Sequence, residues 1–380
     1  MNRVILGLER LQTELPAVLR GAQVGLLAHA ASRLPTGEHA LEVLQSLDLK
    51  VVRLFGPEHG FFGEAAAGEK IGDSRHGKLP LISLYGERRA PDPEHLYDLD
   101  ALVFDVQDVG VRAYTYLATL KACLQSCVGV GVPLVLLDRP NPLGRAVYGA
   151  GVSEGFTSFV SSHDVRFVHG MTFGEVGTVL ARSLQAEGFL HVVSMLAYSG
   201  QPWQDTRLPW RAPSPNLPTL ESAQLYPATV FLEGTNISEG RGTDAPFALL
   251  GAPWLDAHSL ADALNARLSE LYAEPAHFTP TASKYEGAEV SGVRLRRTGI
   301  ADPIRAARVL MTEIRAQNPE AFDWLGRDRY FVDLLAGGDV LRHTVEGNVS
   351  ETDFAQWLRS GERLEFQRVT LYPSSPLLTL

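Results

Sequence analysis

Short apolar runs alternate with helical patterns over roughly the first 200 residues. We predict strands at residues 23–27, 50–55, 79–85, 101–106, 133–137 and 190–195, and helices at residues 38–47, 114–128 and 173–187. Strands that are apolar throughout are typical of sheets covered on both faces, and the helices between them supply the crossovers that parallel strands need. The pattern therefore predicts an α/β domain with a mostly parallel sheet.

The pattern changes after residue 198. Residues 198–227 are rich in Pro, Trp and Ser and predict a long loop, which is usually functional or linking. Beyond it we predict strands at residues 229–232 and 290–295, a loop at 233–246, and helices at 256–272, 303–316 and 351–359. Because 380 residues exceed the usual size of one core, we expect two domains, at residues 1–224 and 225–380, the second a smaller α+β unit.

Composition excludes several classes of function. The chain has 45% hydrophobic and 21% charged residues, as ordinary soluble proteins do, and its net charge of -10 argues against nonspecific nucleic-acid binding. It lacks the run of about 18 apolar residues that a membrane span needs. Glu9 and Arg10 interrupt the N-terminal apolar run before it reaches signal-peptide length. We therefore expect a cytoplasmic protein without membrane partners.

The most informative stretch is Gly56-Pro57-Glu58-His59-Gly60. It follows a predicted strand directly, so it presents a carboxylate and an imidazole at the carboxyl end of that strand. Ligands of open α/β sheets bind in the crevice beyond those ends. Our hypothesis is that Glu58 is a catalytic carboxylate. The alternative is a simple turn in which Glu58 pairs with a nearby arginine, because Gly-Pro also favours turns.

Acidic residues also follow two other predicted strands. Asp105 and Asp108 lie at the end of the strand at 101–106, and Asp138 follows the strand at 133–137. If these strands are parallel neighbours, the acids converge with Glu58 at one edge of the sheet. Burying several carboxylates together is costly, which favours a functional site there.

Familiar cofactor and nucleophile motifs are absent. There is no GxGxxG after a strand, no Walker loop, no HExxH and no GxSxG. Asp105 and Asp108 suggest a magnesium site superficially, but a strand alternates its faces and the two acids need not point together. We therefore expect neither a metal nor a cofactor.

Glu175 has two possible roles. Thr172 and Glu175 have the spacing of a capping box, in which each side chain satisfies a free amide at a helix start. Alternatively Glu175, on the helix that begins just after His169, faces the cleft as a second catalytic carboxylate. The sequence leaves both readings open.

The segment 233–244 (EGTNISEGRGTD) is dense in glycine and hydrogen-bonding groups that can approach and hold a ligand. Arg112, Arg139 and Arg241 are candidate clamps for an anionic substrate group, although each could instead pair with a nearby acid. Tyr114 could stack on a sugar ring, and Trp203 and Trp210 lie in the long loop and could form a cleft wall.

Six motifs in order identify a resemblance. They are GPEHGFFGE, LVFDVQDVGVRAYTYLATL, LDRPNPLG, HGMTFGE, LPWRAPSPNLPT and FLEGTNISEGRGTDAPFALLGAPW, and they resemble the exo-β-N-acetylmuramidase (NamZ-type) family over nearly the whole chain. The resemblance implies a Rossmann-like domain joined to a smaller auxiliary domain, with the active site in the cleft between them. It also implies a glycoside hydrolase that removes terminal N-acetylmuramic acid (MurNAc) from the non-reducing end of peptidoglycan fragments such as MurNAc-GlcNAc.

The resemblance assigns the catalytic glutamate to Glu58. We expect Glu58 to be the principal catalytic acid/base, with His59 beside it in the catalytic group and both His59 and Asp105 tuning its pKa. The second carboxylate is Glu175 or Glu239, unless the 2-acetamido group of the sugar serves as the nucleophile. The predicted substrate-binding residues are Asp105, Gln107, Arg112, Tyr114, Arg139, Asn141, His169, Asn216, Asn236, Glu239 and Arg241. The alternatives are a non-catalytic muropeptide-binding protein and a metal-dependent hydrolase.

Overall fold

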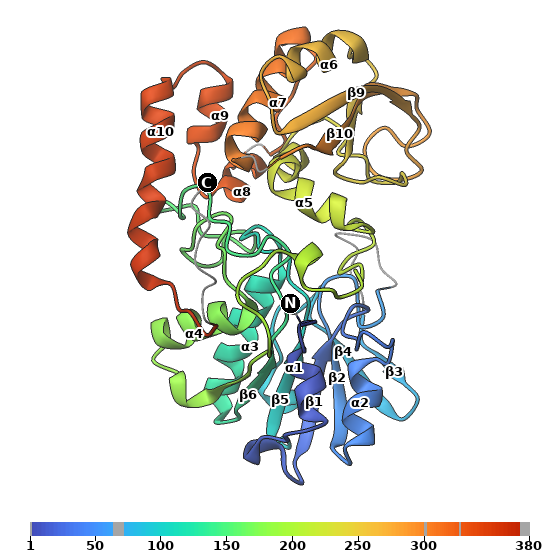
Figure 1. The fold of residues 1–380 in the computed structure, drawn as a ribbon, viewed down its shortest axis with the longest axis vertical. Coiled ribbons are helices and arrows are strands. Elements are labelled where there is room, and N and C mark those ends of the chain that lie inside the picture. The colour runs from blue at the N-terminus through green and yellow to red at the C-terminus, as the bar shows by residue number, and fades with distance from the viewer. Residues whose placement is uncertain (1, 64–71, 300–301, 327, 373–380) are drawn as a thin grey trace.

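The structure is a computed structural model that describes residues 2–63, 72–299, 302–326 and 328–372 (Figure 1). The glutamate that ends the GPEHGFFGE motif, Glu64, lies outside these residues. The chain forms two stacked lobes, one around a large sheet and the other around a small sheet with helices at its side.

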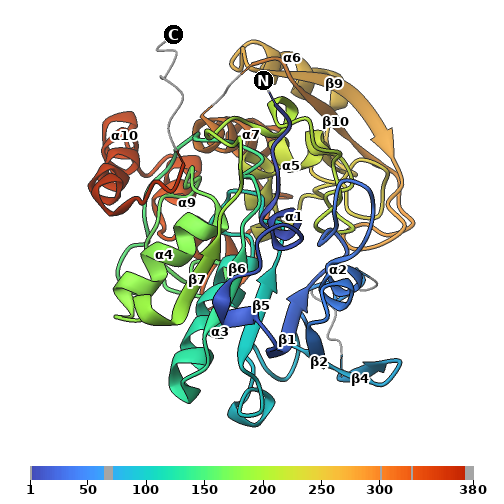
Figure 2. The same cartoon turned by 60° about the horizontal axis from the view of Figure 1, so that its bottom comes forward.

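The first lobe has a seven-stranded sheet of order β3-β4-β2-β1-β5-β6-β7. In Figure 2 its strands follow one another from β7 at the left to β4 at the right. All neighbours are parallel except β3 and β4. The strands are β1 (Gln23–Ala28), β2 (Lys50–Gly56), β3 (Ser74–His76), β4 (Leu79–Ser83), β5 (Ala101–Asp105), β6 (Leu134–Leu137) and β7 (Leu190–Val193). The predicted α/β class with a mostly parallel sheet is confirmed.

Alternation along the strands explains how the sheet is covered on both faces. Leu102 and Phe104 of β5 join one apolar core with helices α3 (Tyr116–Val130) and α4 (Phe173–Ser183). Ala101 and Val103 join a second core with α1 (Gly7–Leu11) and α2 (Ala40–Ser46). Successive side chains of a strand point to opposite faces, so a strand covered twice must be apolar throughout.

The second lobe has a three-stranded antiparallel sheet of order β8-β10-β9. Its strands are β8 (Leu249–Ala252), β9 (Leu271–Phe278) and β10 (Val290–Arg297). Its helices are α5 (Leu220–Thr229), α6 (Ala257–Asn265), α7 (Pro303–Gln317), α8 (Phe331–Ala336), α9 (Val340–Val345) and α10 (Glu351–Ser360). Short 3-10 helices occur in both parts of the chain. Those before α5 are η1 (Ala17–Leu19), η2 (Pro93–His95), η3 (Glu187–Phe189) and η4 (Trp203–Asp205), and those after it are η5 (Val230–Gly234) and η6 (Gly361–Gln367).

Two secondary-structure predictions for this lobe are wrong. The predicted strand at 229–232 is helical: it continues α5 into η5, and Val230, Phe231 and Leu232 are fully buried there. The predicted helix at 256–272 ends at Asn265, and strand β9 begins at Leu271. In both places tertiary packing overrides local propensity.

The chain returns to the first lobe near residue 372. The backbone N–H of Leu371 donates to Glu175 Oε1 (3.0 Å), and the Tyr372 hydroxyl donates to Asp138 Oδ2 (2.5 Å). Tyr372 also packs in an apolar cluster with Met195 and Trp203. The chain therefore crosses from the first lobe to the second at the start of α5 and comes back at this returning segment.

Candidate active site

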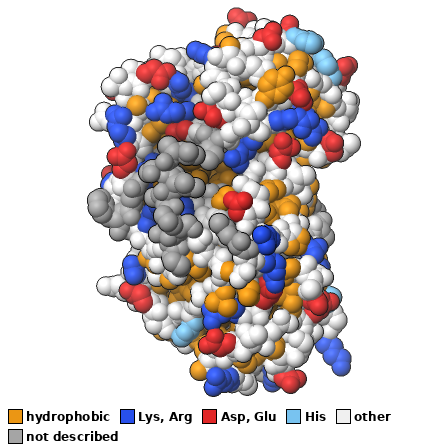
Figure 3. Space-filling view, in the orientation of Figure 1, with side chains coloured by type: hydrophobic (Ala, Val, Ile, Leu, Met, Phe, Trp, Pro, Cys, Tyr) orange, Lys and Arg blue, Asp and Glu red, His pale blue; other side chains and the backbone are white. Residues whose placement is uncertain are grey.

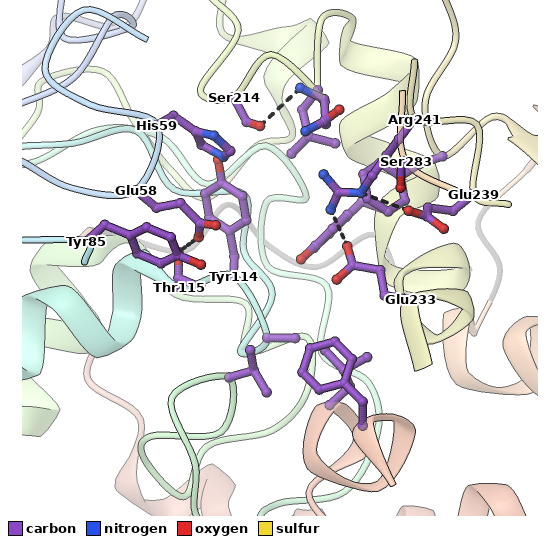
Figure 4. A pocket seen from close by; sticks show the side chains of 18 of the residues that line it. Glu58, His59, Tyr85, Tyr114, Thr115, Ser214, Glu233, Glu239, Arg241 and Ser283 are labelled. Atoms are coloured by element: carbon purple, nitrogen blue, oxygen red, sulfur yellow. Dashed lines mark hydrogen bonds and ion pairs between the residues drawn. The ribbon is translucent and has the colours of Figure 1, made fainter. Parts of the chain in front are cut away.

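A cavity of about 340 Å³ lies between the two lobes. Loops of the first lobe contribute Glu58, His59, Tyr85, Tyr114, Thr115 and Asn216, and the second lobe contributes Glu233, Glu239, Arg241, Ser283, Lys284 and Phe331. In Figure 4, Glu58 and Tyr85 face Glu233, Glu239 and Arg241 across the pocket. The cavity therefore brings carboxylates from distant parts of the sequence together.

The turn after β2 places Glu58 in the cavity. A β-carbon on Gly56 would lie 2.9 Å from the backbone nitrogen of Phe61, so glycine lets the chain fold back sharply. The Gly60 N–H then donates to the Pro57 carbonyl (3.0 Å). His59 has a φ of +72°, where glycine or asparagine is usual. Such left-handed residues are costly and concentrate at functional sites.

Hydroxyl groups surround Glu58, which is only 9% exposed. Thr115, just before α3, donates its hydroxyl to Glu58 Oε2 (2.6 Å), and the Tyr116 hydroxyl donates to the Glu58 carbonyl (3.2 Å). Burial and then the Glu58 carboxylate raise the pKa of the Tyr85 hydroxyl. These hydroxyl donors help to orient Glu58 in the cavity.

The opposite wall is a chain of alternating charges. Arg241 Nη2 lies 2.6 Å from Glu233 Oε1, and Arg241 Nε lies 2.8 Å from Glu239 Oε1. Lys284 Nζ lies 2.9 Å from Glu239 Oε2 and also donates to two backbone carbonyls. Burial, reinforced by Glu239 and opposed by Arg241, raises the pKa of Glu233. The residues on either side of Lys284, Ser283 and Tyr285, both have positive φ, so backbone strain accompanies its placement.

Six of the predicted site residues line this cavity: Glu58, His59, Tyr114, Asn216, Glu239 and Arg241. Sequence reasoning missed the roles of Tyr85, Thr115, Glu233 and Lys284. Glu233 opens the segment 233–244 that we selected for its polar content, so its signal was present. Lys284 comes from the loop between β9 and β10 and has no recognisable motif around it.

Asp105, Arg139 and Gln107 lie at the same sheet edge but outside the cavity. Arg139 Nε and Nη2 bind both carboxylate oxygens of Asp105 (2.5 and 2.8 Å), and both residues are buried. The Gln107 side chain donates to the carbonyls of Asp108 and Pro140 (2.8 and 2.9 Å). The acids at the carboxyl ends of the parallel strands do lie along the same side of the sheet, as predicted. Among them only Glu58 lines the cavity, because the others bind side chains and backbone groups of the neighbouring loops.

Four further predicted binding residues are occupied by protein contacts away from the cavity. Arg112 donates to the carbonyls of Ala150, Val165 and Ala336. The Asn141 side chain donates to the Met171 carbonyl and accepts from the Leu143 N–H. His169 Nε2 lies 3.4 Å from Asp108 Oδ2. The Asn236 side chain donates to the Ala321 carbonyl and accepts from the Asp323 N–H. Their polar groups stabilise loops instead of facing the ligand space.

Trp203 and Trp210 also lie outside the cavity wall. They pack edge to face with ring centroids 5.1 Å apart, in the apolar cluster that receives Tyr372. Their prediction as a cleft wall is wrong because their rings close the contact with the returning segment.

Glu175 is fully buried and does not line the cavity. Its carboxylate accepts from the Thr172 N–H (2.9 Å), pairs with Arg145 Nη1 (2.5 Å) and accepts from the Leu371 N–H (3.0 Å). The capping-box interpretation therefore describes its contacts, and we do not propose it as a second catalytic acid.

Charged side chains of both signs are interspersed over the coloured part of the face shown in Figure 3. Among the helices in the described part of the chain, none is both long and apolar enough to cross a membrane. Within the same residues, no group of three or more His, Cys, Asp and Glu side chains is arranged to hold a metal ion. Cys123 and Cys127 are buried free thiols.

Comparisons with known proteins identify the family of the chain. Two family models match, described as exo-beta-N-acetylmuramidase NamZ, N-terminal, over residues 24–221 and C-terminal over residues 224–370. The chain is 37% identical over 358 residues to the peptidoglycan beta-N-acetylmuramidase NamZ of Bacillus subtilis (strain 168), covering 92% of this chain and 86% of that protein.

Two crystal structures of DUF1343 family proteins from Bacteroides fragilis NCTC 9343 share the fold. The first has a TM-score of 0.85 and is 28% identical, and the match covers 97% of this chain and 99% of that protein's chain. The second has a TM-score of 0.76 and 26% identity, covering 98% and 100%. With both family models covering most of the chain, it belongs to the exo-beta-N-acetylmuramidase NamZ family of glycosidases.

Proposed function

We propose that this protein is a glycoside hydrolase that releases terminal MurNAc from the non-reducing end of peptidoglycan fragments such as MurNAc-GlcNAc, for cell-wall recycling. The observation that carries the proposal is the placement of Glu58 in a cavity whose opposite wall holds two more carboxylates, Glu233 and Glu239. Glycosidases need a carboxyl group that protonates the leaving oxygen and a second group that either activates a water molecule or attacks the anomeric carbon of the sugar. The family membership supports the same reaction.

In this mechanism Glu58 protonates the glycosidic oxygen and later accepts a proton from water. Thr115 donates to Glu58 Oε2, which helps to orient the carboxylate in the cavity. His59, held by the strained turn, lines the same space. Asp105 takes no direct part, because it lies outside the cavity and pairs with Arg139.

The second function falls to the opposite wall. Glu239 lies between Arg241 and Lys284, which balance the charge of its carboxylate. That carboxylate can activate water, attack the sugar carbon, or accept the N–H of the 2-acetamido group when the acetamido oxygen is the nucleophile. We assign the second function to Glu239, with Arg241 and Lys284 as positioning residues.

Replacing Glu58 by Gln tests the assignment. We expect release of MurNAc from MurNAc-GlcNAc to fall by about 10²- to 10⁴-fold, because the shape is kept and the transferable proton is lost. Product release is measured by chromatography, with Glu154→Gln, an exposed glutamate, as the matched control. Near-normal release by Glu58→Gln would exclude Glu58 as the acid. A wild-type protein that binds the fragment without cleaving it would instead support the binding-protein alternative.

Two further expectations remain proposals. We place the domain division near residue 224, between the ranges of the two family models, and limited proteolysis that cuts elsewhere first would contradict it. We also propose a cytoplasmic location, which cell fractionation tests directly.

A further inference from the structure

An anionic substrate creates a charge problem in this cavity. MurNAc carries a carboxylate on its lactyl ether, and the cavity already holds three carboxyl groups against two cations. Both cations are committed to protein groups. Arg241 lies between Glu233 and Glu239, and Lys284 uses its three donors on Glu239 and the carbonyls of Leu232 and Ile237. A substrate carboxylate would therefore need a cation from outside this set.

The other arginines considered from the sequence cannot supply it. Arg112 is 1% exposed and donates to three backbone carbonyls, and Arg139 is 5% exposed and binds Asp105 with two nitrogens. Moving either guanidinium to the cavity would leave buried carbonyls or a buried carboxylate without a partner, which is costly.

Arg89 is placed differently. Its Cζ lies 4.1 Å from the ring centroid of Tyr85 and 4.3 Å from that of Phe159, within the range of cation–π contacts. Tyr85 lines the cavity, and so does Val160, the residue after Phe159. The Arg89 side chain is exposed, and among the residues that the structure describes no acid forms an ion pair with it. Its neighbour Arg88, by contrast, pairs with Asp73 and Asp92 (2.7 and 3.1 Å).

The contacts with the two rings leave N–H groups of the Arg89 guanidinium available to a ligand. The ring centroids of Tyr85 and Phe159 lie 6.2 Å apart, so the two rings contact Arg89 from adjacent sides and its exposed side chain keeps the other sides open. A carboxylate can bind there to the N–H groups of the guanidinium. Both Glu58 and Arg89 interact with the Tyr85 hydroxyl. One tyrosine therefore connects the proposed acid to a cation at the edge of the cavity.

We propose that Arg89, held on Tyr85 and Phe159, is a specificity-determining residue that binds the lactyl carboxylate of MurNAc. This inference rests on the proposed function. It explains how a cavity with an excess of acids accepts an anionic sugar, and it assigns the preference for MurNAc over N-acetylglucosamine to a residue outside the two acidic walls.

The test compares charged and neutral forms of one substrate. Values of kcat/KM are measured on a chromogenic MurNAc β-glycoside and on its lactyl methylamide, which has the same shape without the charge. The variants are Arg89→Gln, Arg89→Lys and the matched control Arg20→Gln. Arg20 is an exposed arginine just before β1, so it lies at the amino ends of the parallel strands, whereas Glu58 follows the carboxyl end of β2. Thermal denaturation confirms that each variant is folded.

We expect Arg89→Gln to lower kcat/KM on the carboxylate about 10- to 100-fold, the range for a charged hydrogen bond. On the methylamide the change should stay within about twofold, because that substrate offers no charge to Arg89. Arg89→Lys should lie between, since it keeps the charge but loses the planar edge. Arg20→Gln should leave both substrates unchanged.

Three results would overturn the inference. Equal slowing of both substrates would show that Arg89 only supports Tyr85, and an unchanged carboxylate rate would show that it does not meet the substrate. A loss seen only with a muropeptide whose lactyl group is amidated by the stem peptide would assign Arg89 to peptide carboxylates instead.

Failure of the proposed function gives a different signature. If the wild-type protein cleaves neither substrate, calorimetric binding of MurNAc and N-acetylglucosamine still tests Arg89. A preference for MurNAc that disappears in Arg89→Gln would support anion recognition in a non-catalytic protein, and a preference that persists would overturn it.

Discussion

At the scale of the residue, Asp138 shows how a buried acid is stabilised away from the cavity. Its carboxylate accepts from the Thr172 hydroxyl (2.7 Å), the Gly174 N–H (2.8 Å) and the Tyr372 hydroxyl (2.5 Å). Burial raises the pKa of Asp138 to about 6, although these donors act to lower it. The folded state therefore binds more protons than the unfolded chain between about pH 4 and 6, so this residue makes stability fall as the pH rises through that window.

We predict that Tyr372→Phe lowers the free energy of unfolding by about 1–3 kcal/mol, because an ionised buried carboxylate loses a donor. Loss of that donor raises the folded-state pKa of Asp138 further. The deficit should therefore be smallest near pH 4 and grow as the pH rises through 6 and above. Urea unfolding at pH 5 and pH 8 measures it, with Tyr272→Phe on an exposed strand position as the control. A pH-independent deficit would contradict the link to Asp138.

At the scale of the element, α4 begins where three parts of the chain meet. The helix start, Arg145 and the returning segment near Leu371 all bind the Glu175 carboxylate. These contacts give the start of α4 a structural role, because each one satisfies a polar group that would otherwise be buried without a partner.

We predict that Glu175→Gln lowers the free energy of unfolding by about 1–3 kcal/mol while kcat/KM for MurNAc release changes less than about twofold. The variant loses the ion pair with Arg145 but keeps the side-chain oxygen that caps the helix. Chemical denaturation and the chromatographic assay measure the two effects, with Glu154→Gln as the control. A large loss of activity in a fully stable variant would restore Glu175 as a catalytic candidate.

Elements of the first lobe could be predicted from the sequence because its parallel strands, such as β5, are continuous apolar runs. Strand β9 could not be predicted in this way. More exposed and more buried positions alternate along it, so it has no continuous apolar run, and no turn motif separates it from helix α6. Within the site, Glu58 was predictable from a local motif. The position of Lys284 depends on contacts with Glu239, 45 residues away, and no local pattern records such a contact.

At the scale of the whole molecule, the cavity needs both lobes. The first lobe carries Glu58 and the second carries Glu233, Glu239 and Arg241. Neither wall alone holds both of the functions proposed for the reaction, so any ligand that fills the cavity contacts both lobes at once.

We predict that N-acetylmuramic acid protects the backbone amides of both walls together in hydrogen exchange, around residues 56–60 and 233–241. At a concentration 100 times its Kd it should raise the free energy of unfolding by about 2.7 kcal/mol, because it binds only the folded state. N-acetylglucosamine at the same concentration is the control and should protect less. Protection confined to one wall would place the ligand outside the cavity.

The contacts between the lobes also decide how the cavity can open. One apolar core runs through both lobes, and the Arg112 side chain of the first lobe donates to the Ala336 carbonyl of the second. Swinging the lobes apart would expose that core to water and leave buried polar groups without partners, which is costly. Admission of a sugar and departure of the product should therefore depend on the side chains and loops at the cavity rim. The two walls, with Glu58 opposite Glu239, would then keep their spacing through each turnover.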